Sequence, residues 1–147
     1  MTEIATPRGA EGLAALLGQV RIIESDGEAG RAGVEYLATM AMCHSGGVVQ
    51  GGFIAGWLDQ AMSMAVMATH DHELSPMTLE MKVSYFAPAG PGTVIAEGWV
   101  ERAGRSTAFL EGRLLNGRGE ILAKASATAR LIPRARVEQR AREQLGE

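Results

Sequence analysis

The chain has a single cysteine, Cys43, among its 147 residues, so it can form no internal disulfide. Such sparing use of cysteine is typical of a reducing compartment and predicts a cytoplasmic protein. Positive charge is not in excess either, because 14 Lys and Arg residues stand against 17 Asp and Glu residues, for a formal net charge of −3. Nucleic-acid binding needs a concentrated positive face, so no nucleic-acid partner is expected.

Long hydrophobic runs are also missing. Residues 1–8 contain no apolar core of signal-peptide length, and no run reaches the roughly 18 apolar residues that a membrane span requires. We therefore expect no targeting peptide and no membrane partner. The length suits a single domain and leaves no room for a separate cofactor domain. We expect this one domain over residues 1–133, followed by a charged tail over 134–147.

The hydrophobic pattern predicts one long helix among several strands. Residues 53–69 are rich in Ala, Leu and Met, which favours a helix, and a shorter helix is expected near 10–20. A strand is predicted over 31–42, followed by a glycine-rich loop over 43–52. Beyond the long helix the period changes from 3.6 to 2, which predicts four further strands over 78–87, 93–102, 106–115 and 120–132.

The short turns between these four strands indicate an antiparallel meander. Within the first of them, alternation is expected to put Leu79, Met81, Val83 and Tyr85 on one face. The predicted fold class is therefore α+β, a curved antiparallel sheet that holds one buried helix.

One carboxylate interrupts the apolar helix. On a helical wheel, Asp59 shares a narrow stripe with Gly52, Gly56 and Ser63, and Gln60 lies at its edge. The stripe is either the edge of the helix that faces solvent or the lining of a crevice that its small residues open to another group. A carboxylate in such a crevice suits general-base work or attack on an activated carbonyl.

The glycine-rich segment 46–52 leads into the start of this helix. Unpaired N–H groups and the positive end of the helix dipole gather at a helix N-terminus. A carbonyl oxygen placed there would be polarised, and an oxyanion forming on it would be stabilised. The glycines alone are equally typical of a tight turn, but donors at the helix start together with Asp59 two turns further on predict chemistry at a carbonyl group.

The stretch His44-Ser-Gly-Gly-Val-Val-Gln50-Gly-Gly, with Asp59 nine positions after Gln50, resembles the hotdog-fold acyl-CoA thioesterases, and most closely their PaaI-like branch of the phenylacetate pathway. That branch has Asn-x-x-Gly-x-x-His-Gly-Gly before its central helix and an acidic residue nine positions after the His. Here His44 stands in place of the Asn, and Gln50 in place of the His. The segment 79–89 (LEMKVSYFAPA) is similar to the strand that follows the helix in the family.

The resemblance implies an acyl-CoA thioesterase that acts on an aromatic or medium-chain acyl group. Coenzyme A would enter as part of the substrate, and no other cofactor is implied. Asp59 would serve as general base or nucleophile, while the Gly51 N–H would polarise the thioester carbonyl with help from Gln50 and His44.

The family also places a hydroxyl beside the acid, for which Ser63 and Thr78 are the two candidates. Arg102, Arg105 and Ser106, in a turn between two strands, are the candidates to meet the phosphates of coenzyme A. By resemblance, the protein would be a homodimer whose active sites combine the loop of one subunit with the acid of the other, and the dimers would pair into a homotetramer.

Two other functions stay open at this point. One is a hotdog acyl-thioester dehydratase or hydratase that pairs His44 with Asp59, and the other is an acyl-CoA binding module without catalysis. Cys43 and His44 are not expected to form a nucleophile–base pair, because neighbours in an extended chain point apart. No metal is expected, since the cluster at 70–73 (HDHE) lacks a second group of ligands.

Overall fold

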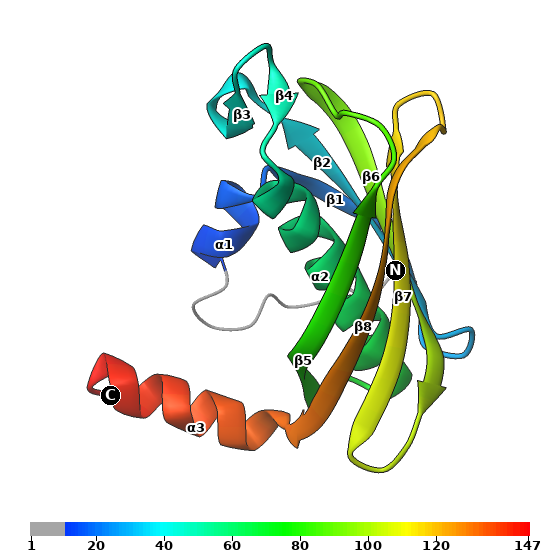
Figure 1. The fold of residues 1–147 in the computed structure, drawn as a ribbon. Helices are drawn as coiled ribbons and strands as arrows, with labels where there is room; N and C mark the ends of the chain where they lie inside the picture. The colour runs from blue at the N-terminus through cyan, green and yellow to red at the C-terminus, as the bar shows by residue number, and fades with distance from the viewer. Residues whose placement is uncertain (1–10) are drawn as a thin grey trace.

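A six-stranded antiparallel sheet curves around one long helix, α2 (Gly51–Thr69), in the computed structural model, which describes residues 11–147 (Figure 1). The strands lie in the order β1-β2-β6-β7-β8-β5. Their bounds are β1 (Gln19–Asp26), β2 (Arg31–Ala38), β5 (Leu74–Tyr85), β6 (Gly92–Ala103), β7 (Thr107–Asn116) and β8 (Ile121–Pro133). The α+β architecture, with a curved sheet holding a buried helix, is therefore confirmed.

The remaining elements are short or peripheral. A helical turn, η1 (Met40–Met42), and a two-stranded ladder of β3 (Cys43–His44) and β4 (Val48–Val49) form the loop before α2. The charged tail forms helix α3 (Arg134–Leu145), which extends from the end of β8 and has no buried residue (Figure 1).

The N-terminal region differs from the prediction of a helix near 10–20. Helix α1 (Glu11–Leu16) ends early, because Gly18 adopts a φ of 73° that terminates a helix readily. Strand β1, which follows it, was not predicted. Its pairing with β2 shifts register twice, and these irregularities disturb the alternation of apolar and polar residues that identifies a strand.

The expected meander of four strands is only partly correct. Strands β6, β7 and β8 do form a meander, but β5 pairs with β8 at the opposite edge of the sheet. The segment after β5 is a crossover past the start of α2, where the carbonyl of Ala89 accepts a hydrogen bond from the Val49 N–H at 2.8 Å. A short connection therefore did not mean adjacent strands here.

Small residues line the sheet where α2 crosses it. Ala32, Gly98, Gly112 and Ala125 are paired in register across β2, β6, β7 and β8, and all four are buried. A Cβ atom at Gly98 would lie 2.6 Å from the Ala61 carbonyl carbon and the Met62 nitrogen. The helix backbone thus rests almost directly on the strand backbone.

Two aromatic residues complete the core beside the helix. The rings of Tyr36 and Trp57 stack with their centroids 5.6 Å apart, and the Trp57 indole donates to the Leu17 carbonyl oxygen at 2.7 Å. The Tyr36 hydroxyl donates to the side-chain oxygen of Gln60. Burial raises the pKa of Tyr36 above its usual range, so this hydroxyl stays neutral and remains a donor.

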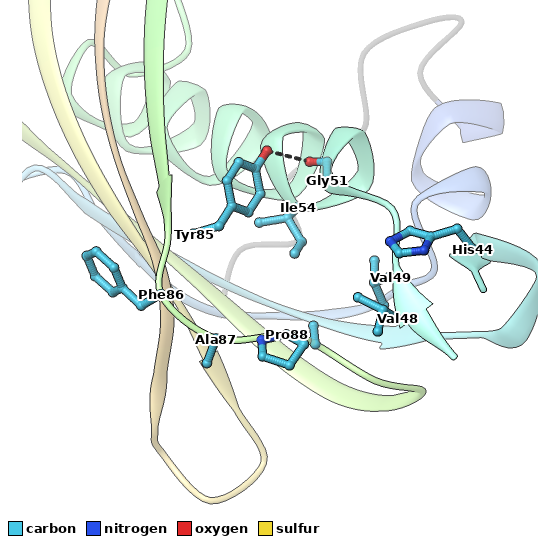
Figure 2. A pocket seen from close by; sticks show the side chains of 10 residues that line it. His44, Val48, Val49, Gly51, Ile54, Tyr85, Phe86, Ala87 and Pro88 are labelled. Carbon is cyan, nitrogen blue, oxygen red and sulfur yellow. Dashed lines mark hydrogen bonds between the residues drawn. The ribbon is translucent and has the colours of Figure 1, made fainter. Parts of the chain in front are cut away.

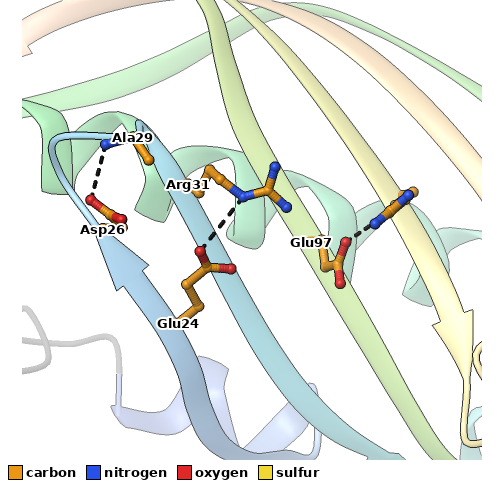
Figure 3. Close-up of polar contacts among 6 residues, drawn as sticks. Glu24, Asp26, Ala29, Arg31 and Glu97 are labelled. Carbon is orange, nitrogen blue, oxygen red and sulfur yellow. Dashed lines mark hydrogen bonds and ion pairs between the residues drawn. The ribbon is translucent and has the colours of Figure 1, made fainter.

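The outer face of the sheet is polar, in contrast to the face that holds α2. Figure 3 shows the ion pair of Arg31 with Glu24, at 3.5 Å, while Glu97 pairs with Arg113 at 2.7 Å. Both guanidinium groups lie about 6 Å from the centre of the Trp99 ring. Exposed pairs of this kind contribute at most about 1 kcal/mol each, so α2 and the inner face provide most of the stability.

Replacing Gly98 with alanine should lower the free energy of unfolding by about 1–3 kcal/mol, because the new methyl group would collide with the backbone of α2. The matched control is Gly117→Ala, where a Cβ atom would meet nothing nearer than 3.9 Å and the change should stay within about 0.5 kcal/mol. Urea denaturation measures both variants. Equal stability of the two would contradict the close seat of α2 on the sheet.

Candidate active site

Asp59 is the one charged residue of α2, and it is partly buried. The hydroxyl of Thr78, on the neighbouring strand β5, donates to its Oδ1 atom at 2.7 Å. The other predicted hydroxyl, that of Ser63, makes no such bond to Asp59 within residues 11–147. Of the two candidates, the structure therefore brings Thr78 to the acid.

An irregularity in β5 aims Thr78 at the helix. The pairing of β5 with β8 shifts register between Thr78 and Glu80, so that Thr78 lies opposite Ala129 while Met81 lies opposite Ala127. Both alanines are buried on the inner face, which turns Thr78 and Met81 to the same side although they are three residues apart. The extra residue, Leu79, is 66% exposed, so the prediction that it shares a face with Met81 was wrong.

Among the described residues, the start of α2 leaves one N–H group, that of Gly51, without a partner. Gln50 is the N-cap, and its side-chain oxygen accepts from the Gly52 N–H at 2.8 Å, while its carbonyl accepts from the Phe53 N–H at 3.0 Å. The Tyr85 hydroxyl donates to the Gly51 carbonyl at 2.8 Å (Figure 2). For the Gly51 N–H, no acceptor is present among residues 11–147, so it is available to a ligand.

A cleft of about 340 Å³ opens beside this free N–H group. Figure 2 shows His44 at one side of the cleft and Tyr85 and Phe86 at the other. Most of its lining is apolar, as suits the hydrocarbon part of a ligand. The residues that line it are His44, Val48, Val49, Gly51, Ile54, Tyr85, Phe86, Ala87, Pro88 and Ala89.

The glycines of the predicted stripe make room for the chain's own side chains. A Cβ atom at Gly52 would lie 2.6 Å from the Gln50 side-chain oxygen, and one at Gly56 would lie 3.3 Å from a methyl group of Leu17. At these two positions, side chains of the same chain therefore lie beside the stripe, while Gly52 itself is exposed. Asp59 is the stripe residue that bonds across to β5.

Asp59 and the free N–H group are well separated within one chain. Asp59 is eight positions after Gly51 on the same α-helix, which places the two about 12 Å apart along the axis. Asp59 does not line the cleft, and within the described chain His44 makes no bond to it. A single subunit thus does not assemble all the predicted groups around one carbonyl.

The predicted phosphate-binding residues lie further away still. Arg102, Arg105 and Ser106 are exposed in and beside the turn between β6 and β7. This turn is at the end of the sheet near the C-terminus of α2, whereas the cleft is at its N-terminus (Figure 1). One chain alone does not bring them together with Gln50 and Gly51.

Within residues 11–147, no group of three or more His, Cys, Asp or Glu side chains is arranged to hold a metal ion. None of the helices described is long and apolar enough to cross a membrane.

The Cys43 thiol donates to the Thr39 carbonyl at 3.4 Å.

Tyr85 was not predicted as part of the site. Alternation along the strand placed it on one face with Met81 and Val83, but its hydroxyl contact with Gly51 joins positions 34 residues apart. Only one signal in the sequence could have indicated this contact: Tyr85 is an aromatic residue near the end of a strand expected to pack beside the helix.

Comparisons with known proteins agree with this architecture. The thioesterase superfamily model matches residues 46–123, just over half of the chain. A candidate esterase of Saccharolobus solfataricus is 31% identical over 98 residues, which are 67% of this chain and 69% of that protein.

Two solved structures are also similar. A candidate thioesterase of Ralstonia eutropha JMP134, related to phenylacetic acid degradation, is 34% identical with a TM-score of 0.77, and the match covers 86% of this chain and 92% of the other. A hypothetical thioesterase of Streptococcus pneumoniae TIGR4, determined with coenzyme A, shares the fold at 19% identity and a TM-score of 0.70, over 77% of this chain and 85% of the other.

These matches confirm the hotdog fold and the resemblance to the phenylacetate branch. The family match includes the end of the loop before α2 from residue 46, all of α2 and the strands β5, β6 and β7. The chain therefore belongs to the thioesterase superfamily, as a hydrolase of thioesters.

Proposed function

We propose that the protein is an acyl-CoA thioesterase in which Asp59 acts on the thioester carbonyl as general base or nucleophile. The observation that carries the proposal is the pairing on one helix of a lone, partly buried carboxylate, oriented by Thr78, with a free N–H group at Gly51. The similar protein of Streptococcus pneumoniae was determined with coenzyme A, which supports a coenzyme A ester as substrate.

The proposal includes a homodimer with shared active sites, because 12 Å of helix separates Asp59 from Gly51 in one chain. In an isologous dimer each contact occurs twice, so two antiparallel α2 helices would bring each Asp59 to Gly51 of the partner subunit. Strand β5 is an edge of the sheet, and its side chains Met77 and Leu79 are 47% and 66% exposed. An apolar sheet edge of this kind is suited to pairing with a second copy.

Each step of the hydrolysis has a group to perform it. The Gly51 N–H donates to the carbonyl oxygen and stabilises the negative charge that develops there, and the side-chain amide of Gln50 and the His44 ring add further donors at the same end of the helix. In the general-base route, Asp59 takes a proton from water, the hydroxide bonds to the carbonyl carbon, and the C–S bond breaks. The proton then passes to the departing thiolate, which gives a free acid and coenzyme A.

In the nucleophilic route, an Asp59 oxygen bonds to the carbonyl carbon and displaces the thiolate, and water then cleaves the mixed anhydride. Thr78 serves either route in the same way, because its bond to Oδ1 orients the carboxylate and leaves Oδ2 for the reaction. Ser63 lies one turn further along α2 and could supply a hydroxyl to the water.

The proposed substrates carry an aromatic or medium-chain acyl group. The support is the apolar cleft beside Gly51, which Val48, Ile54 and Phe86 help to line. A two-fold dimer would place the C-terminal end of one α2 beside the N-terminal end of the other, so the turn with Arg102, Arg105 and Ser106 would approach the partner's cleft and meet the coenzyme A phosphates.

We further propose that dimers pair into a homotetramer and that the enzyme works in the reducing cytoplasm. The first part rests on the resemblance to the family, and the second on Cys43 being the one cysteine of the sequence.

Asp59→Asn should lower kcat for acyl-CoA hydrolysis by about 10²–10⁴-fold, because the amide can neither accept a proton nor attack the carbonyl. The release of free thiol from a panel of acyl-CoA esters measures this. The matched control is Asp71→Asn, an exposed position with a φ of 50°, a conformation that asparagine also tolerates, and it should keep the wild-type rate. A fully active, folded Asp59→Asn enzyme would refute the role of the acid.

Subunit mixing tests the shared site. Gly51→Pro removes the free N–H group. The extended backbone of Gln50 before it, with φ −63° and ψ 134°, permits proline, although the new Cβ atom would lie 3.1 Å from the Tyr85 hydroxyl oxygen and displace that contact too. Homodimers of Gly51→Pro and of Asp59→Asn should both be inactive. Heterodimers purified through two different tags should recover about half of the wild-type activity, since one of their two sites is intact. Inactive heterodimers would mean that each site belongs to a single chain.

A further inference from the structure

We propose that Tyr85 is a positioning residue of this enzyme. Its hydroxyl and the Gln50 side chain hold the peptide group between Gly51 and Gly52 from both sides, and we call this pair of contacts the Gly51 clamp. Gly51 lines the cleft, and the clamp fixes the peptide group that follows its free N–H. The inference rests on the proposed function, because that N–H is the group proposed to bind the thioester carbonyl.

The hydrogen bonds at the helix start support the clamp. Two peptide groups, Gln50–Gly51 and Gly51–Gly52, carry four polar atoms, and three of them are bonded. The Gln50 carbonyl accepts from Phe53, the Gly51 carbonyl accepts from Tyr85, and the Gly52 N–H donates to Gln50. Within residues 11–147 the Gly51 N–H is the fourth atom and has no acceptor. Because Gly51 lines the cleft, a ligand bound there can accept from this N–H group.

The two glycines are explained by the clamp and not by backbone conformation. Neither Gly51 nor Gly52 has a positive φ, so another residue could adopt the same backbone. A Cβ atom at Gly51 would lie 3.1 Å from the Tyr85 hydroxyl oxygen, and one at Gly52 would lie 2.6 Å from the Gln50 side-chain oxygen. Each contact of the clamp therefore occupies the space that a side chain would need.

Tyr85 reaches the helix from β5, the same strand that supplies Thr78. The Thr78 hydroxyl orients the carboxylate of Asp59, and the Tyr85 hydroxyl holds the start of α2. One strand thus orients both the carboxylate of Asp59 and the helix start that carries the carbonyl-binding N–H group. Any shift of β5 along α2 would change the aim of both groups together.

The test uses Tyr85→Phe, which keeps the aromatic ring and removes the hydroxyl. Two inert ligands with the same acyl group separate its roles: a ketone analogue, in which a methylene group replaces the sulfur but the carbonyl remains, and an alkyl thioether of coenzyme A that has no carbonyl. Tyr85→Phe should lower kcat and the affinity for the ketone by about 2–10-fold, the worth of one hydrogen bond. The affinity for the thioether should stay within about twofold.

Gly52→Ala breaks the other half of the clamp, because its methyl group displaces the Gln50 side chain. The loss of the Gln50 capping bond weakens the helix, but alanine favours a helix over glycine by up to about 1 kcal/mol, which offsets that loss. This variant should therefore lose affinity for the ketone while its melting temperature stays close to that of the wild type. If the role of the clamp were merely structural, the melting temperature would fall while the affinity for the ketone stayed close to that of the wild type.

Phe86→Leu serves as the matched control, since Phe86 lines the cleft next to Tyr85 and is proposed to contact the acyl group. It should change the affinities for ketone and thioether equally. If Tyr85→Phe changes both affinities equally, or neither, the positioning role is wrong while the proposed function stands. If the wild-type enzyme neither hydrolyses acyl-CoA esters nor binds either analogue, the proposed function itself is wrong.

Discussion

The close approach of α2 to the sheet is the constraint on which the other features depend. It exists because Gly98 and Gly112, paired in adjacent strands, present no side chain beneath the helix. With larger residues there, α2 would move outward by the size of a side chain. The hydroxyl groups of β5 could then no longer reach Asp59 and the Gly51 carbonyl at 2.7 and 2.8 Å. Packing at the centre of the sheet therefore sets the geometry at its edge.

Strand β5 orients the groups on α2 that we propose to react. A helix positions its side chains by rotation about one axis, but the direction of a carboxylate or of a peptide group needs a second contact from outside. Thr78 and Tyr85 supply these contacts from a strand that runs antiparallel to the helix. Because β5 is also an edge of the sheet, the proposed dimer contact and the proposed active site would involve the same strand.

Local patterns in the sequence were enough to predict the fold class, the long helix and the meander of β6, β7 and β8. These depend on hydrophobic periodicity and on turn residues close together in the chain. The placement of β5 beside β8 could not be predicted this way, since it depends on a crossover past the start of α2. The contact of Tyr85 with Gly51 joins distant residues, and β1 has two register shifts that disturb its alternation. Asp59 could be singled out as a candidate because a lone charge on an apolar helix is visible in the sequence.

The extra residue in β5 matters for how this protein is compared with its relatives. Leu79 adds one residue to the strand but has no partner on β8. Before Leu79 the even-numbered Thr78 faces the helix, and after it the odd-numbered residues, such as Met81, do so. A relative that lacks this insertion would carry its equivalent hydroxyl one step closer in sequence to the inward-facing residue that matches Met81. If β5 were aligned without a gap to the equivalent strand of such a relative, Thr78 would be matched with an outward-facing residue. A hydroxyl that both proteins share would then be missed. Relatives should therefore be matched here by ladder position, with a gap opposite Leu79.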